Sequence, residues 1–127
     1  VKVEEAVNRL GEIAFNLGML AMSEKVLVAF SYACNFLEAF GDVIISWMHL
    51  WRPTVPFHKL ASLAGSADPD TLRKKVEKSK EAAFYDGQVK TAEFFIHTIL
   101  PVAMGKMNAI AFAHGAAIDI SDTGFGG

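Results

Sequence analysis

Three polar side chains that could do chemistry lie in the apolar stretch of residues 36–53, FLEAFGDVIISWMHLWRP. They are Glu38, Asp42 and His49. Two carboxylates four residues apart on a helix can perturb each other's pKa, and a nearby imidazole could then exchange a proton with them. The stretch therefore raises three hypotheses: a metal or proton-transfer site, a polar edge on a core helix, or a charged interruption in a membrane span.

These residues belong to a longer polar stripe on one predicted helix. Its members follow one another in alternating steps of four and three residues: Ser31, Asn35, Glu38, Asp42, Ile45 and His49. At about 100° per residue they occupy a narrow sector of roughly 80°. We expect this stripe to face solvent or a partner domain, with Asn35 and His49 hydrogen-bonded to neighbouring helices or to that partner.

The spacing of the possible metal ligands does not match that of a typical metal site. A ferritin-like di-iron site needs two Glu-x-x-His pairs and further Glu residues from facing helices. Glu93 and His97 are four residues apart, and no second pair exists. The single Cys34 lacks the second thiolate of a typical zinc site, and it favours a reducing compartment, so we expect a cytoplasmic protein. We predict no catalytic residue, no cofactor and no metal on this chain.

Charge and hydropathy narrow the classes of partner. A charged residue near the centre of a membrane span costs about 2.5–3.5 kcal/mol on insertion scales, so Glu38 and Asp42 argue against a transmembrane segment here. The net charge of −2 and the isoelectric point near 6.1 give no electrostatic footprint for nucleic acid. A hydrophobic share of 52% with a mean hydropathy of +0.29 is high for a soluble chain. We therefore expect a partner to cover some of the apolar surface.

Apolar periodicity predicts the first two helices. One amphipathic helix runs from about Val3 to Ala21, and Ser23 is the predicted N-cap of a second helix that runs from Glu24 to Trp51. The second helix carries a broad apolar stripe that we expect to lie in the core of a bundle: Val26, Phe30, Ala33, Leu37, Phe40, Ile44, Trp47 and Trp51. A flanking row widens this stripe: Ala29, Phe36, Val43 and Leu50.

Prolines and glycines divide the remainder of the chain. Pro53 should end the second helix, and a short helical piece follows over residues 56–64. Asp68 and Pro69 form an N-cap with proline at the first helical position of a long helix, which contains Gly87 and is kinked at Pro101. The prediction is an all-α antiparallel bundle of about four helices with long central helices. Residues 1–114 form this single domain, and residues 115–127 form a flexible tail.

Two stretches of the sequence form a recognisable pattern: Leu37, Phe40, Gly41 and Trp47 in the first, and Phe84, Tyr85, Gly87, Thr91, Ala92, Phe95, Leu100 and Pro101 in the second. In this order they resemble the helical domain at the extreme C-terminus of some bacterial acyl-CoA dehydrogenases. The sequence departs from the family pattern at Trp51-Arg52-Pro53, where the helix usually runs on, and at Glu93 and Val102, which are often basic.

The resemblance implies a parent enzyme that contains FAD and oxidises acyl-CoA to trans-2-enoyl-CoA in fatty-acid or related acyl-CoA oxidation. A glutamate of the dehydrogenase core removes the α-proton, flavin N5 takes the β-hydride, and electrons pass to an electron-transfer flavoprotein. Because this chain lacks that core, it is expected to be a non-catalytic domain that packs on the core or at the interface of a homo-oligomer. The start at Val1 rather than Met agrees with a piece of a longer protein. The alternative is a free-standing helical module for protein interaction or membrane-surface binding.

Overall fold

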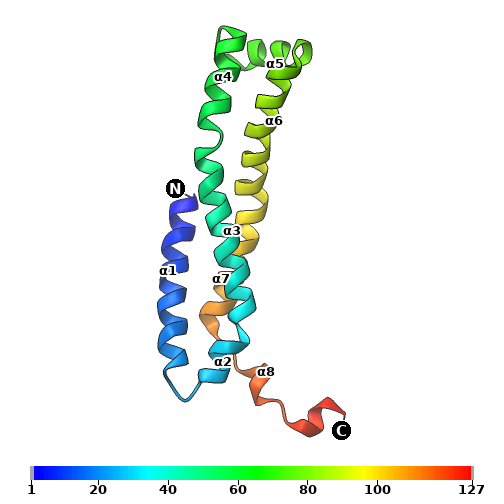
Figure 1. The fold of residues 1–127 in the computed structure, drawn as a ribbon. Helices are drawn as coiled ribbons and strands as arrows, with labels where there is room; N and C mark the ends of the chain where they lie inside the picture. Colours follow the sequence, from blue (N-terminus) through cyan, green and yellow to red (C-terminus); the bar gives the residue numbers. More distant parts are fainter. Residues whose placement is uncertain (1, 127) are drawn as a thin grey trace. The chain divides into compact units, whose positions relative to one another are not determined.

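The computed structural model describes residues 2–126, and helices make up most of them (Figure 1). This confirms the predicted all-α class with long central helices. The chain divides into two compact units, Val1–Val43 with Leu100–Gly127 (unit 1) and Ile44–Ile99 (unit 2). The prediction of one bundle domain over residues 1–114 with a flexible tail stays a prediction.

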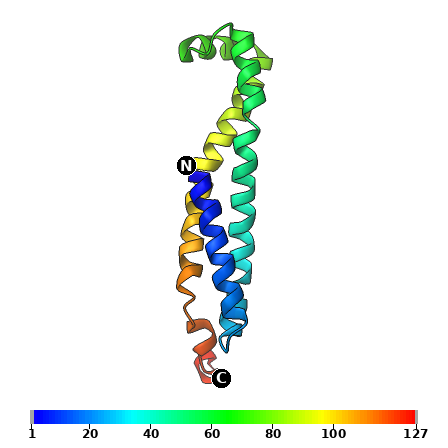
Figure 2. The same cartoon turned by 90° about the vertical axis from the view of Figure 1, so that its left-hand side faces the viewer.

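Unit 1 contains α1 (Lys2–Ala21), α2 (Val26–Ser31), the first half of α3 (Ala33–Trp51), α7 (Leu100–Phe112), α8 (Ala116–Asp119) and the 3₁₀ turn η2 (Asp122–Phe125). Helix α1 packs on α2 and on α7, and α2 packs on α8 (Figure 2). The core of the unit is apolar: Val3, Ala6, Leu10, Ile13, Val28, Ala29, Ala39, Val43, Leu100, Ala103, Met107 and Ile110. Arg9 donates to the side-chain oxygen of Asn108 at 3.3 Å and so joins α1 to α7.

The predicted helix over residues 24–51 is wrong in one respect, because it is divided at Tyr32. The Ser31 hydroxyl donates to the Val28 carbonyl at 2.7 Å, and such local bonds compete with the regular helical pattern. The Tyr32 hydroxyl donates to the His114 carbonyl at 3.0 Å, a long-range contact that periodicity does not reveal. Ser23 does not cap the next helix; its hydroxyl donates to the Leu20 carbonyl at 2.6 Å, at the end of α1.

Unit 2 contains the second half of α3, α4 (Thr54–Ala64), α5 (Pro69–Lys78), α6 (Lys80–Phe94) and the π-helical segment η1 (Phe95–Ile99). Helix α4 packs along α6, and α5 contacts both. The predicted cap of α5 is confirmed, since Asp68 accepts the Thr71 backbone N–H at 3.0 Å and Pro69 is the first helical residue. Helix α3 ends at Trp51, as Pro53 predicts.

The predicted long helix from Pro69 to Pro101 is also interrupted. Ser79 is extended, and its hydroxyl accepts the Ala82 backbone N–H at 3.3 Å, so this serine ends α5 and caps α6. Gly87 lies inside α6, as predicted. The irregularity expected at Pro101 takes the form of η1, which directly precedes α7. Proline lacks the N–H that the carbonyl of residue 97 would accept in an α-helix, and a wider turn accommodates that loss.

The helical run Lys80–Phe112 is long and apolar enough to cross a membrane by length and composition alone. Core helices of soluble proteins pass the same test, and this run is a different segment from the one in which Glu38 and Asp42 argue against a span. The prediction of no transmembrane segment therefore stays a prediction.

Candidate functional site

The polar stripe is not one site in this structure. In unit 1, the Lys106 ammonium on α7 donates to a Glu38 carboxylate oxygen on α3 at 2.6 Å. Asp42, one turn further along α3, is half-buried and adds negative charge near the same ammonium. The hydrogen bond to Glu38 is the main cause that holds the pKa of Lys106 above its ordinary value, with further help from the charges of both carboxylates. The sequence did not single out Lys106, which supplies the charge that Glu38 contacts.

His49, Asn35 and Ser31 of the polar stripe do not take part in the contact between Glu38 and Lys106. His49 lies in unit 2, where its ring packs against Phe95 of η1 with 5.0 Å between ring centroids. Asn35 is exposed, and Ser31 bonds within its own turn. Among residues 2–126 there is no group of three His, Cys, Asp or Glu side chains that could hold a metal ion. Ser31, Glu38 and His49 thus have different partners, and within residues 2–126 Asn35 makes none of the predicted hydrogen bonds to a neighbouring helix.

The Lys106–Glu38 pair has a testable titration. Replacing Glu38 with Gln removes the acceptor charge, so we expect the pKa of Lys106 to fall toward its ordinary value. A raised lysine pKa stabilises the fold below the unfolded-state pKa, and that contribution is lost as pH rises through the folded-state pKa. The difference in thermal stability between wild type and Glu38→Gln should therefore be present at neutral pH and disappear in alkali.

NMR titration of the lysine ε-methylene signals measures the pKa of Lys106, and thermal unfolding followed by circular dichroism at several pH values measures the difference in stability. Lys90 is the internal control, because it pairs with Glu93 at 2.8 Å and its raised pKa should not respond to Glu38→Gln. An unchanged Lys106 titration in the variant would show that the pair does not form in solution.

The prediction of the buried side of α3 is right for Val43, a residue of the flanking row, and wrong for the main apolar stripe, which is exposed. The buried residues of this helix are Ala39, Val43 and Ser46, each 0% exposed. The larger predicted core residues face outward: Phe30 of α2 (67% exposed), Leu37 (70%) and Phe40 (44%) in unit 1, and Ile44 (39%), Trp47 (47%) and Trp51 (69%) in unit 2. We call these six residues, taken in each unit by itself, the exposed apolar face.

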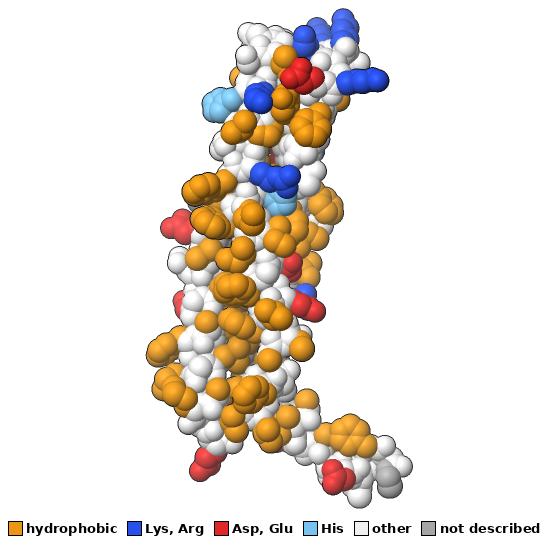
Figure 3. All heavy atoms as spheres, viewed as in Figure 1, with side chains coloured by type: hydrophobic (Ala, Val, Ile, Leu, Met, Phe, Trp, Pro, Cys, Tyr) orange, Lys and Arg blue, Asp and Glu red, His pale blue; other side chains and the backbone are white. Residues whose placement is uncertain are grey.

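In unit 1, hydrophobic side chains gather over α1 and the first half of α3 (Figure 3). In unit 1 they border a groove of about 280 Å³ between α1 and the α2–α3 segment, lined by Ala14, Leu17, Gly18, Ala21, Ala29, Phe30, Ala33 and Phe36. Phe15 and Met19 of α1 are also exposed (69% and 52%). Soluble monomers rarely expose contiguous apolar surface on this scale, and such patches mark sites of interaction.

The residues that carry the family resemblance divide between this surface and the interior. Ala92 and Leu100 are buried (2% exposed each), whereas Leu37, Phe40, Trp47 and Phe84 are exposed. Within α6, the Thr91 hydroxyl donates to the Gly87 carbonyl at 2.8 Å. The Lys59 ammonium of α4 lies 5.4 Å from the centroid of the Tyr85 ring and links α4 to α6. The quoted pattern thus combines packing positions with outward-facing apolar positions.

Comparison with known proteins gives one informative result. A family model described as acetyl-CoA dehydrogenase C-terminal like matches residues 1–121. Searches of curated proteins and of solved structures give no significant match.

Proposed function

Because the chain belongs to the acetyl-CoA dehydrogenase C-terminal-like family, we propose that it is a non-catalytic accessory domain of a longer acyl-CoA dehydrogenase and packs on the dehydrogenase core. The observation that carries the proposal is the exposed apolar face. Water would surround two tryptophans and several other large apolar side chains if nothing covered it, and burying each is worth about 1.5–3 kcal/mol.

The exposed side chains support a partner for each unit. Large apolar side chains are exposed in each unit by itself: Phe30, Leu37 and Phe40 in unit 1, and Trp47 and Trp51 in unit 2. Exposed apolar patches mark sites of interaction. An adjoining dehydrogenase core on the same polypeptide is a partner that is always present.

In this proposal the dehydrogenase core carries out the chemistry of the parent enzyme. The family implies FAD in the parent, but the hollows on residues 2–126 do not fit it. The one lined by Trp47, Met48, Trp51 and Val55 has Arg52 as its only charged side chain and offers few groups for the flavin ring or the ribityl chain. In this proposal the core binds FAD, converts acyl-CoA to trans-2-enoyl-CoA and passes electrons to an electron-transfer flavoprotein. The accessory domain covers the core or an interface of a cytoplasmic homo-oligomer.

The groove in unit 1 favours the alternative, a free-standing helical module that binds a partner. Its small residues, among them Ala14, Gly18 and Ala33, would let an apolar helix approach closely. The coding sequence before residue 1 discriminates between the two proposals. A dehydrogenase core in the same reading frame supports the accessory domain, and a start codon near Val1 supports the free-standing module.

An activity measurement tests whether catalysis requires the dehydrogenase core. Purified residues 1–127 should show no flavin absorbance and no formation of enoyl-CoA, whereas the whole polypeptide should show both. Turnover by the 127 residues alone would disprove a non-catalytic role. A whole polypeptide without flavin would disprove the parent activity.

A further inference from the structure

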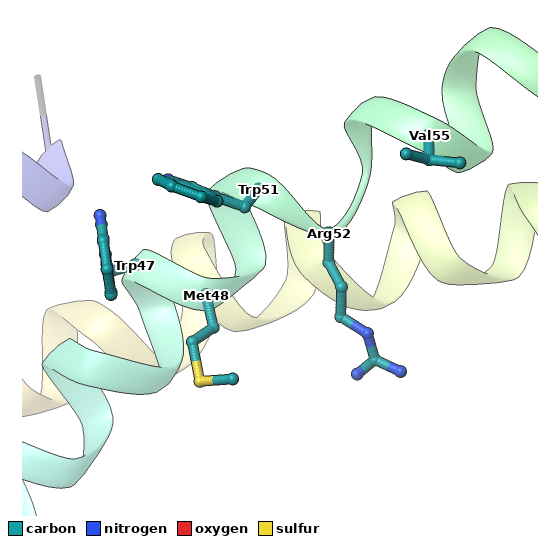
Figure 4. Close-up of a pocket in the computed structure, with 5 residues that line it drawn as sticks. All are labelled: Trp47, Met48, Trp51, Arg52 and Val55. Carbon is teal, nitrogen blue, oxygen red and sulfur yellow. The ribbon is translucent and has the colours of Figure 1, made fainter.

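The two tryptophans of the sequence lie together at the end of α3 in unit 2, beside an arginine with no charged partner in the described chain. Trp47 and Trp51 pack edge to face with 5.4 Å between ring centroids. Met48 (56% exposed) and Val55 (60%) complete an open hollow of about 490 Å³, and Arg52 borders it (Figure 4). Among residues 2–126, no hydrogen bond or ion pair of the structure involves the Arg52 guanidinium.

Helical spacing explains why four of these side chains lie on one side of α3. Trp47 and Trp51 are four residues apart in one row, and Met48 and Arg52 form the neighbouring row. Val55 follows in the first turn of α4, beyond the break between the two helices (Figure 4). We call the five residues the Trp–Arg anchor.

The composition of the anchor is typical of a binding hot spot. Trp and Arg are enriched among residues whose truncation costs 2 kcal/mol or more, and Met is enriched in protein interfaces. The indole rings provide apolar area with few rotatable bonds to immobilise. The guanidinium is planar and always charged, and it is suited to a carboxylate.

We propose that the Trp–Arg anchor docks on the dehydrogenase core through an apolar side chain with an Asp or Glu carboxylate beside it, which Arg52 binds. This inference rests on the proposed function and names the contact that would hold the domain in place. The apolar part of the partner fills the hollow between Trp51 and Met48, and the carboxylate neutralises a guanidinium that docking would otherwise desolvate without a partner.

Two other occupants fit the anchor less well. A second copy of this surface is disfavoured because the anchor contains one Arg and no acidic residue, so two facing copies would bring like charges together. A free fatty acid has the right charge, but residues 47–55 extend over only about 12 Å of helix and form an open surface. Most of a long acyl chain would stay in water.

Photo-crosslinking of the whole polypeptide tests the proposal. Position 48 is changed, Met48→p-benzoylphenylalanine, in the protein that carries residues 1–127, and crosslinked peptides are mapped after irradiation. We expect one segment of the core with an Asp or Glu close to the crosslinked residue. Arg52→Glu should lower the yield about tenfold, because it places like charges together, and Arg52→Lys should lower it less.

Arg73→Glu is the matched control. It makes the same change of charge in the same unit, at a side chain that is 80% exposed on α5, and should leave the crosslink yield unchanged. Replacing the mapped carboxylate with Lys should restore the crosslink in the Arg52→Glu protein.

Each other outcome overturns a specific statement. Three results would disprove docking through the Trp–Arg anchor and leave the proposed function standing. They are the absence of a crosslink although the core is present, a crosslink to residues 1–127 of another copy, and equal yields for Arg52→Glu and Arg73→Glu. Displacement of the crosslink by added fatty acid also disproves this docking, in favour of a lipid site. Absence of a dehydrogenase core from the polypeptide is a failure of the proposed function itself.

Discussion

Leu100→Ala will destabilise unit 1 far more than Leu37→Ala, although both delete the same atoms. Leu100 is 2% exposed at the start of α7, and loss of a buried leucine side chain costs about 2–5 kcal/mol of the free energy of unfolding. Leu37 is 70% exposed on α3, and surface substitutions of this kind usually stay within about 0.5 kcal/mol. Urea titration followed by far-ultraviolet circular dichroism measures both values on the isolated chain.

This comparison decides which side of α3 is the inner one. Leu37 belongs to the main stripe that periodicity places in the core, whereas the structure buries Ala39 and the flanking residue Val43. Equal losses for the two variants would mean that the stripe of Leu37 is buried in solution. Val43→Ala, which removes a side chain with 0% exposure on the same helix, should cost about 1 kcal/mol or more.

Phe40→Asp should release the domain from its partner in the whole polypeptide while leaving its own fold intact. Phe40 is 44% exposed on α3 in unit 1 and packs against Phe36 with 6.3 Å between ring centroids. Truncating a hot-spot aromatic costs about 2 kcal/mol or more, so the ratio of docked to undocked protein should fall about 30-fold or more. A charge at this position adds the cost of burying an unpaired carboxylate.

Binding of an apolar fluorescent dye and protease sensitivity of the segment before residue 1 report the released state. Phe112→Asp is the control, because Phe112 is 85% exposed at the end of α7 and lies outside the exposed apolar face. Unchanged dye binding in Phe40→Asp, with normal helix content, would show that this face is free in the parent enzyme. The proposed packing on the core would then be wrong.

Local chemistry made several features predictable. Pro53 ends α3, and Asp68 with Pro69 begins α5, because proline geometry and capping depend on a few adjacent residues. Ser79 was missed although it is also a cap, since Lys80 and Glu81 continue the helical pattern without a visible change. The break at Tyr32 was not predictable from spacing, because part of its explanation is a bond to His114, 82 residues away.

The sequence by itself determined an all-α protein, its family and a high apolar content. Only the tertiary structure decided which row of α3 turns inward and that Glu38 bonds to Lys106. The physical reason is that α3 is apolar around most of its circumference, so periodicity defines the rows without choosing among them. In the folded chain the row of Ala39 and Val43 is buried, and Leu37, Phe40 and Trp51 stay exposed.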